Sequence, residues 1–303
     1  MKTNKKWTYY LIALGFVLLF IFMLLSSILD VGDRLFSLHP YAAYGFYGMV
    51  ALLVYVLILR PTHIIFLSQT FNIHTSLDVG KNKRLIKQSA KRLLKTSYIL
   101  EEDKNLLRAC NNDVQALIEV MSKLYSGPVK KEMMRVIKDH AKTVMISTAI
   151  SQNGRLDFFT VVVVNLKMIK ELVILSGFRP SLPALAKLSI QVMSTALVAE
   201  GLENLDINDV LPQSTLSSIS EIPLIKPILS STTQGISNAL LTLRIGIVTR
   251  EYLFTSAQGL TKTSIRKTAL LEAASLTPGV VADGLTILPK KIMNIFKTNK
   301  SKM

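Results

Sequence analysis

Cysteine is nearly absent from this sequence: Cys110 is the only one among 303 residues. A single thiol can neither close a disulfide within the chain nor contribute to a cysteine cluster for zinc. Cys110 falls among apolar positions of a helical pattern, so we expect it to be a small buried residue. The shortage of cysteine agrees with a reducing, cytoplasmic environment for most of the chain.

Motifs of catalytic sites are absent as well. The chain has no G-x-x-x-x-G-K-[ST] phosphate loop, no G-x-G-x-x-G, no H-E-x-x-H and no G-x-S-x-G. No two histidines share a predicted helix face, so no metal site is indicated. The acidic run Glu101-Glu102-Asp103 falls in the first turn of a predicted helix, where carboxylates interact favourably with the helix dipole. We therefore predict no catalytic residue, no metal ligand and no cofactor, and we do not expect an enzyme.

Acidic residues are scarce relative to basic ones: 20 Asp and Glu stand against 36 Lys and Arg, a formal charge of +16. Nucleic-acid binding would explain such a charge, but it calls for a recognisable module, and the chain has no zinc-finger spacing or RNP-like sequence. Attraction to anionic lipids of the inner leaflet explains the charge without a module, at about 1 kcal/mol per basic residue near the surface. We expect a lipid bilayer with anionic lipids as a partner, and no nucleic acid.

Charge is missing altogether from two long apolar stretches, Trp7–Leu29 and Tyr41–Leu59. Because an α-helix rises about 1.5 Å per residue, either stretch can cross a hydrocarbon core of about 30 Å. The first stretch is longer than the apolar region of a cleaved signal peptide, and neither has the polar face of a helix at a protein surface. Residues 1–60 are thus predicted to form a transmembrane hairpin with spans 7–29 and 41–59.

The charges beside the two spans predict the orientation of the hairpin. Lys2, Lys5 and Lys6 precede the first span and Arg60 follows the second, whereas the connecting loop Asp30–Pro40 has a single basic residue. Positive charge stays on the cytoplasmic side of a membrane. Both termini should therefore be cytoplasmic, and only the short loop should cross.

A basic amphipathic helix is predicted where the chain leaves the membrane. Residues 61–100 are interpreted as a linker, Pro61–Gly80, followed by a helix over Lys83–Thr96 with apolar and basic residues on opposite faces. We expect this basic run to contact anionic lipid headgroups; the alternative is a solvated helix face whose charges only serve the orientation rule. The basic run consists of Lys81, Lys83, Arg84, Lys87, Lys91, Arg92 and Lys95.

Helical periodicity continues through the rest of the chain. Residues 101–254 are predicted to form a helical domain, and residues 255–303 a basic C-terminal tail with short helices at Lys262–Leu276 and Val280–Phe296. The predicted helices of the domain are Glu101–Tyr125, Val129–Ile150, Phe158–Leu175, Leu182–Ala199 and Ile236–Phe254, with stops at Gly127-Pro128 and at Gly177 with Pro180. The fold class is all-α: a two-helix transmembrane hairpin followed by a helical bundle that is cytoplasmic or partly membrane-embedded.

Three apolar segments raise the question of further spans. Charges at a bilayer centre cost about 2.5–3.5 kcal/mol each, and Lys167, Lys170 and Glu171 lie in one segment while Arg244 lies near the middle of another. Burial inside a bundle is therefore favoured over spanning. The alternative is a multi-spanning transporter or pore-forming protein that uses segments 158–175, 182–199 and 236–254, with charged side chains along a polar path.

Asn165, Asn238 and Arg244 lie amid apolar neighbours, where a buried polar group must find a partner. One hypothesis pairs Arg244 with Asp157 or Glu171 in a network that specifies helix pairing or an oligomer interface. The other hypothesis lets the long Arg244 side chain reach solvent.

Four sequence pieces follow one another in a defined order between residues 150 and 246. They are Ile150-Ser-Gln-Asn-Gly-Arg-Leu-Asp157, Asn165-Leu-Lys-Met-Ile-Lys-Glu-Leu, Gly177-Phe-Arg-Pro180 and Gly235-Ile-Ser-Asn-Ala-Leu-Leu-Thr-Leu-Arg-Ile-Gly246. Together with the two spans, they resemble the YcjF-type family of conserved bacterial membrane proteins, whose shared domain has no assigned biochemical activity. The signature positions are Asn153, Gly154, Asp157, Asn165, Glu171, Gly177, Arg179, Pro180, Asn238, Arg244 and Gly246.

The resemblance implies a multi-pass protein of the bacterial cytoplasmic (inner) membrane. Similar domains occur fused behind Era-like GTPase domains, which implies a membrane-side partner of a P-loop NTPase. This chain has no GTPase domain of its own, so any nucleotide chemistry would belong to the partner. We therefore expect a membrane scaffold or regulator without its own catalysis, working with a P-loop NTPase and assembling as a homo-oligomer.

Overall fold

The computed structural model describes residues 5–68, 71–73, 77, 79–151, 154–197, 229–254 and 261–300. The chain forms two compact units, Met1–Leu67 and Ser68–Met303, which we describe one at a time. Every regular element in the described ranges is a helix, so the predicted all-α class is confirmed. The run Val161–Val164 favours a strand locally, because β-branched residues are common in strands. In the structure it lies inside the helix Gly154–Leu175.

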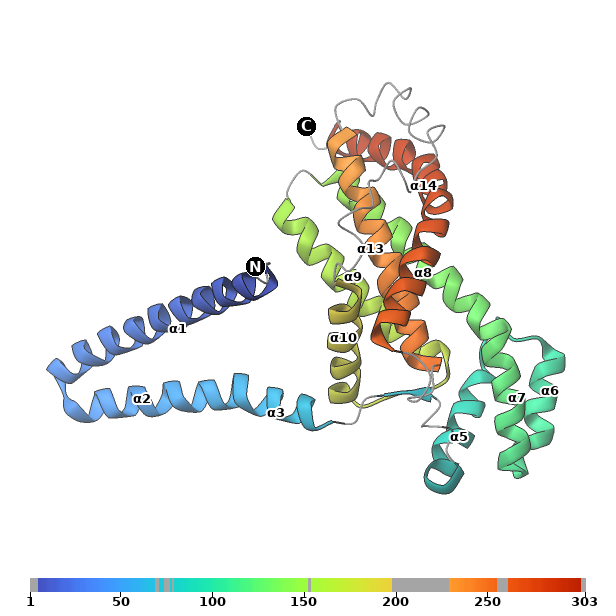
Figure 1. Cartoon of the computed structure of the whole chain (residues 1–303), viewed down its shortest axis with the longest axis horizontal. Helices are drawn as coiled ribbons and strands as arrows, with labels where there is room; N and C mark the ends of the chain where they lie inside the picture. The colour runs from blue at the N-terminus through green and yellow to red at the C-terminus, as the bar shows by residue number, and fades with distance from the viewer. Residues whose placement is uncertain are drawn as a thin grey trace. The chain divides into compact units, whose positions relative to one another are not determined.

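The first unit is a helical hairpin (Figure 1). Helix α1 (Lys5–Leu38) contains the predicted first span, and α2 (Pro40–Val54) continues through a π-helical turn η1 (Tyr55–Leu59) into α3 (Arg60–Leu67). The loop predicted for Asp30–Pro40 is wrong, because only His39 separates α1 from α2. The chain turns there because a residue before proline avoids the helical region, and His39 is extended with φ −163° and ψ 128°.

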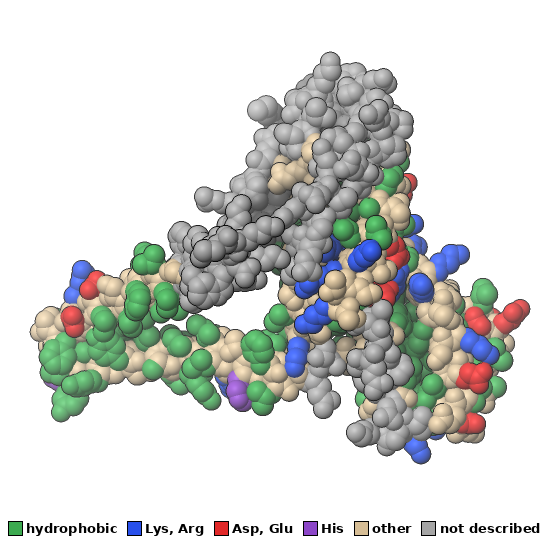
Figure 2. Space-filling model, in the orientation of Figure 1, with side chains coloured by type: hydrophobic (Ala, Val, Ile, Leu, Met, Phe, Trp, Pro, Cys, Tyr) green, Lys and Arg blue, Asp and Glu red, His purple; other side chains and the backbone are tan. Residues whose placement is uncertain are grey.

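The two helices of the hairpin pack closely near the turn. Ala43 is buried, and a Cβ on Gly32 would lie 2.0 Å from the Tyr47 hydroxyl, so a glycine is needed for this approach. Elsewhere the apolar side chains point outward (Figure 2). The continuous helix Pro40–Leu67 is long and apolar enough to cross a membrane, and none of its most apolar window is buried in protein.

The second unit is a helical bundle built around one central helix. Its elements are α5 (Val79–Leu93), α6 (Glu101–Ala109), the 3₁₀ turn η2 (Cys110–Asn112), α7 (Val114–Ser126), α8 (Pro128–Ile150), α9 (Gly154–Leu175), α10 (Leu182–Leu197), α13 (Leu229–Phe254) and α14 (Lys262–Lys300). Helix α13 contacts α8, α9, α10 and α14, and residues 242–250 are all buried. A helix that is apolar on every side requires such enclosure.

The continuity of the helices differs from the expectation in α6–α7 and in α14. The helix predicted over Glu101–Tyr125 is interrupted, because the Asp113 carboxylate accepts hydrogen bonds from the backbone N–H groups of Gln115 (2.9 Å) and Ala116 (3.3 Å) and caps α7. The two short helices predicted in the tail form the single helix α14. It packs on α13 and α8 through residues such as Ile265 and Ala269, so the bundle extends into the predicted tail.

Helix α14 is the second helix that is long and apolar enough to cross a membrane, over Lys262–Ile287. One third of its most apolar window, 33%, is buried inside the bundle, in contrast to the bare helix Pro40–Leu67. We therefore describe α14 as a bundle helix.

Glycines allow α8 and α13 to approach each other closely. A Cβ on Gly235 would lie 2.7 Å from the Met145 carbonyl oxygen, and one on Gly246 would lie 2.6 Å from the Ile137 side chain. Gly246 is a predicted signature position, and its role here is this close packing. Both close contacts lie in the interface between α13 and α8.

The C-terminal end of α9 is shaped by Gly177, the predicted stop. Gly177 has φ +81°, and among the described residues it alone has a positive φ. Only glycine adopts this conformation without strain at a helix end. A Cβ here would also meet the Ser89 carbonyl oxygen of α5 at 2.7 Å.

Gly177→Ala should destabilise the protein, by about 1–3 kcal/mol for a strained left-handed residue. The matched control is Gly279→Ala in α14, where nothing lies within 4 Å of a new Cβ and alanine favours the helix by up to about 1 kcal/mol. Thermal unfolding of the full chain in detergent, followed by circular dichroism, measures both. Equal midpoints for the two variants would contradict the assigned role of Gly177.

Candidate functional site

A buried arginine with two carboxylate partners is the most elaborate polar feature of the bundle. Arg250 of α13 forms a bidentate pair with Glu272 of α14, with Nη1–Oε1 and Nη2–Oε2 distances of 2.7 and 2.8 Å. Its Nη2 also donates to Glu251 Oε1 at 2.8 Å. Burial opposes the charge on Arg250, but the two carboxylates outweigh it and raise the pKa of the guanidinium. The Arg250 cluster (Arg250, Glu251, Glu272) therefore ties α14 to α13.

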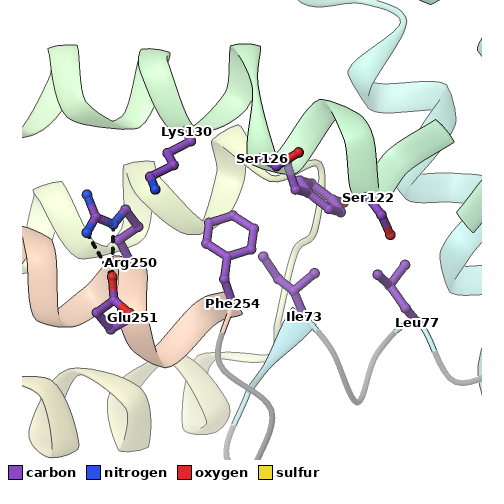
Figure 3. A pocket seen from close by; sticks show the side chains of 9 residues that line it. Ile73, Leu77, Ser122, Ser126, Lys130, Arg250, Glu251 and Phe254 are labelled. Carbon is purple, nitrogen blue, oxygen red and sulfur yellow. Dashed lines mark hydrogen bonds and ion pairs between the residues drawn. The ribbon is translucent and has the colours of Figure 1, made fainter. Parts of the chain in front are cut away.

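A cavity of about 360 Å³ opens beside the Arg250 cluster. Figure 3 shows Phe254 in the middle of the lining, with Lys130 and the Arg250–Glu251 pair on one side and Ile73 and Leu77 on the other. One side of the cavity is thus charged, and the other combines apolar side chains with the hydroxyl groups of Ser122 and Ser126. Its lining includes two serines but no histidine or cysteine, so these residues offer no activated nucleophile. The full lining is Ile73, Leu77, Ser122, Tyr125, Ser126, Lys130, Arg250, Glu251 and Phe254.

Polar side chains also connect α13 to α8 and α9. Asn165 Nδ2 of α9 donates to Thr242 Oγ1 at 3.3 Å and to the Val161 carbonyl oxygen at 2.8 Å. Asn238 Nδ2 donates to Thr148 Oγ1 of α8 at 3.2 Å, and Thr242 Oγ1 donates to the Asn238 carbonyl oxygen at 2.9 Å. The Nδ2 groups of both asparagines thus have partners inside the bundle. We call Thr148, Asn165, Asn238 and Thr242 the polar ladder.

Arg244 lies inside the bundle and not at its surface. Only 1% of the residue is exposed, so the hypothesis that its side chain reaches solvent is wrong. Burial, together with the charge of Arg266, lowers the pKa of the guanidinium. Glu171 has a different partner, His140 of α8, with a 2.9 Å distance between Nε2 and Oε2. The pairing of Arg244 with Asp157 stays a prediction, because the Asp157 side chain lies outside the described part of the structure.

The end of α9 receives hydrogen bonds from side chains far away in the sequence. Tyr98 Oη donates to the Leu175 carbonyl oxygen at 2.5 Å, Tyr125 Oη to that of Ser176 at 2.9 Å, and Arg92 Nη1 to that of Gly177 at 3.0 Å. These donors satisfy carbonyls that a helix end leaves open. Burial raises the pKa of the Tyr98 hydroxyl to about 12, and it also raises the pKa of the Tyr125 hydroxyl. Arg179 and Pro180 follow, exposed and half-buried respectively.

The predicted lipid-contact residues lie on and after α5. Lys83, Arg84, Lys91 and Lys95 are exposed, and Lys87 is half-buried. Arg92 instead faces the end of α9, where it binds Gly177, so it serves the fold. The contact of the others with lipid stays a prediction. The Lys81 side chain and Asn153 lie outside the described part of the chain, and Gly154 begins α9.

A family model described as Domain of unknown function (DUF697) matches residues 112–274. The chain belongs to the DUF697 family. The expected membership of a conserved family of unknown function is thereby confirmed. No curated protein and no solved structure matches the chain.

The DUF697 match includes the whole polar ladder and the Arg250 cluster, but neither the hairpin nor α5 and α6. It also extends past residue 254, where we predicted a tail, to include Glu272. From the sequence, Arg250 and Glu251 are expected in the helix Ile236–Phe254, and no functional role is predicted for either residue. The available signal was a charged pair in an otherwise apolar helix, but nothing in the spacing pointed to Glu272 or Lys130. Within the described ranges, no group of three or more His, Cys, Asp or Glu could hold a metal ion.

Arg250→Met should lower the free energy of unfolding by about 2–3 kcal/mol. This loss is smaller than the usual cost of breaking a buried ion pair, because the carboxylates of Glu251 and Glu272 are partly exposed. Adding Glu272→Met should restore part of the loss, since it removes the stranded carboxylate. The control is Lys123→Met, which breaks an exposed pair with Glu119 and should cost about 0–1 kcal/mol. Thermal unfolding of the full chain measures all three. If Arg250→Met and Lys123→Met unfold alike, the cluster does not hold α14 to α13.

Proposed function

We propose that this protein is a scaffold or regulator of the bacterial inner membrane, without catalysis of its own, that works with a P-loop NTPase. The observation that carries the proposal is the joining of an apolar hairpin to a bundle in which the buried Arg250 is bound by two carboxylates. Arg250 forms ion pairs with Glu272 and Glu251. Hydrogen bonds of the polar ladder join α13 to α9 and α8. Side chains engaged in this way hold helices together and are not free to react.

Lipid is the solvent that the hairpin requires. The helix Pro40–Leu67 has a mean hydropathy of 2.1 in its most apolar window, and none of that window is buried by the protein. Soluble monomers do not expose apolar surface over such a length. The flanking lysines and Arg60 support cytoplasmic termini, with the turn at His39 on the opposite side.

The NTPase partner is proposed from the family resemblance. Domains similar to this one occur fused behind Era-like GTPase domains, whereas this chain has no phosphate-binding motif. A separate partner would then supply the nucleotide chemistry, and the bundle would hold it at the membrane. The basic run of α5 supports an additional contact with anionic lipids.

The arrangement of the bundle favours this reading over a transporter. Helix α13 is enclosed by four other helices, and its charged residues Arg244 and Arg250 are buried. Helix α10 has 16 residues, which rise only about 24 Å, less than a hydrocarbon core. Packing inside the bundle therefore accounts for α13, and α10 is too short to span.

Cysteine labelling should place Leu38 and Lys123 on opposite sides of the membrane. Both residues are highly exposed, and Cys110→Ser removes the only native thiol. In spheroplasts, a membrane-impermeant maleimide should label a cysteine at Leu38 directly but one at Lys123 only after permeabilisation. Labelling of both from outside would disprove a cytoplasmic bundle, and labelling of neither would disprove the hairpin orientation.

Purification of the tagged full chain in mild detergent should recover a P-loop NTPase, and the purified chain alone should not hydrolyse nucleotides. Adding the chain in proteoliposomes to the recovered NTPase should change its hydrolysis rate, because a regulator acts through differential binding of nucleotide states. Proteoliposomes with Gly177→Ala, if it destabilises the bundle, give the folding control. Recovery of the chain alone, or intrinsic hydrolysis, would contradict the proposal.

A further inference from the structure

Helix α9 is apolar on two opposite sides. Toward the bundle it buries Met168, Ile169 and Leu172 completely. Away from the bundle it exposes four large apolar side chains at helical spacing: Phe159 (66% exposed), Val163 (62%), Leu166 (41%) and Ile174 (44%). A helix that is apolar all round needs a partner for each side, and the bundle covers only one of them.

The neighbouring helix α10 has the same character. It contacts α9 and buries Leu188, Val192 and Ala196. It exposes Leu182 (79%), Ile190 (55%) and Leu197 (57%). We call the exposed apolar residues of these two helices the outer face: Phe159, Val163, Leu166, Ile174, Leu182, Ile190 and Leu197. Apolar exposure of this extent marks an interaction surface on a folded protein.

The charges on the outer side of α9 are positive. Lys167 and Lys170 are exposed. Their spacing of four residues, from Val163 and Ile174 respectively, places them on the same face of α9 as these apolar residues. The nearby acid, Glu171, binds His140 of α8. An apolar stripe with lysines suits an anionic lipid surface, where the apolar side chains enter the acyl region and the ammonium groups meet phosphates.

The first residue of the bundle unit binds helix α10. Ser68 directly follows Leu67, the last residue of the apolar helix Pro40–Leu67. The Ser68 carbonyl oxygen accepts a hydrogen bond from Lys187 Nζ, which belongs to α10. Helix α10 therefore lies beside Ser68, the first residue of the bundle unit.

We propose that the outer face of α9 and α10 docks onto the anionic leaflet of the membrane in which the hairpin is anchored. The bundle is then a domain that lies on the bilayer, in addition to being tethered to it. This inference rests on the proposed anchoring, and it adds a second, shallow membrane contact that needs no further span. A second copy of the chain is the competing occupant of the outer face.

Depth-dependent fluorescence quenching tests the docking in the full chain. In the Cys110→Ser background, single cysteines replace Val163 and Ile190 on the outer face, Leu52 in the proposed span, and Leu106 on α6. All four positions are exposed apolar residues, so the label replaces no core packing. Each variant carries an environment-sensitive fluorophore and is reconstituted in phosphatidylcholine–phosphatidylglycerol vesicles with or without lipids that carry a spin label on the acyl chain.

Quenching at Val163 and Ile190 should exceed that at Leu106 at least about two-fold, because an interfacial helix places its apolar face about 5–10 Å into the headgroup–acyl boundary. Quenching at Leu52 should be the strongest. Lys167→Glu with Lys170→Glu, or omission of phosphatidylglycerol, should reduce the quenching at Val163 and leave that at Leu52 unchanged.

Two results separate the proposals. If quenching is strong at Leu52 but no stronger at Val163 and Ile190 than at Leu106, the docking is overturned and the anchor is kept. Absence of quenching at Leu52 would overturn the anchor itself. Energy transfer between labels at Val163 of two copies, without quenching by lipid, would assign the outer face to self-association and also overturn the docking.

Discussion

The enclosure of α13 is the constraint on which the rest of the bundle depends. Over residues 242–250 it has protein on all sides, so polar side chains there need partners inside the protein. Asn238 and Thr242 thereby select α8 and α9, and Arg250 selects α14. Apolar packing supplies most of the stabilisation, while these directed contacts determine which helix occupies which side of α13.

The end of α9 is a second point where distant parts of the chain depend on each other. Gly177 creates the left-handed exit and allows the backbone of α5 to approach. The carbonyls freed by this exit are then bound by Arg92, Tyr98 and Tyr125. Helix α5 and Tyr98, which precede the DUF697 match, are thus attached to it through backbone carbonyls at the end of α9, and a side chain at position 177 would disturb this contact.

The sequence predicted the helices well because their signals are local. Gly127-Pro128 and Gly177 act on their own turns, and apolar periodicity defines α8, α9 and α13. It failed for α14, where two short helices were predicted, whereas one continuous helix packs on α13 and α8. The partner of Arg250 could not be predicted either, because Glu272 is near only once α14 has folded back. The same holds for His140 with Glu171, which pair across two helices.

Hydropathy also left open how often the chain enters the bilayer, and the reason is physical. Apolar content measures how much surface must leave water, but it does not distinguish protein from lipid as the medium that receives it. Helix α13 and the helix Pro40–Leu67 are both rich in apolar residues, yet the first is enclosed by helices, whereas none of the most apolar window of the second is buried. Helix α9 combines the two cases, with one side against the bundle and the other exposed beside Lys167 and Lys170. Charges that would be costly at a bilayer centre are favourable at its surface, so lysines that argue against a span are the residues expected on a helix that lies on the membrane.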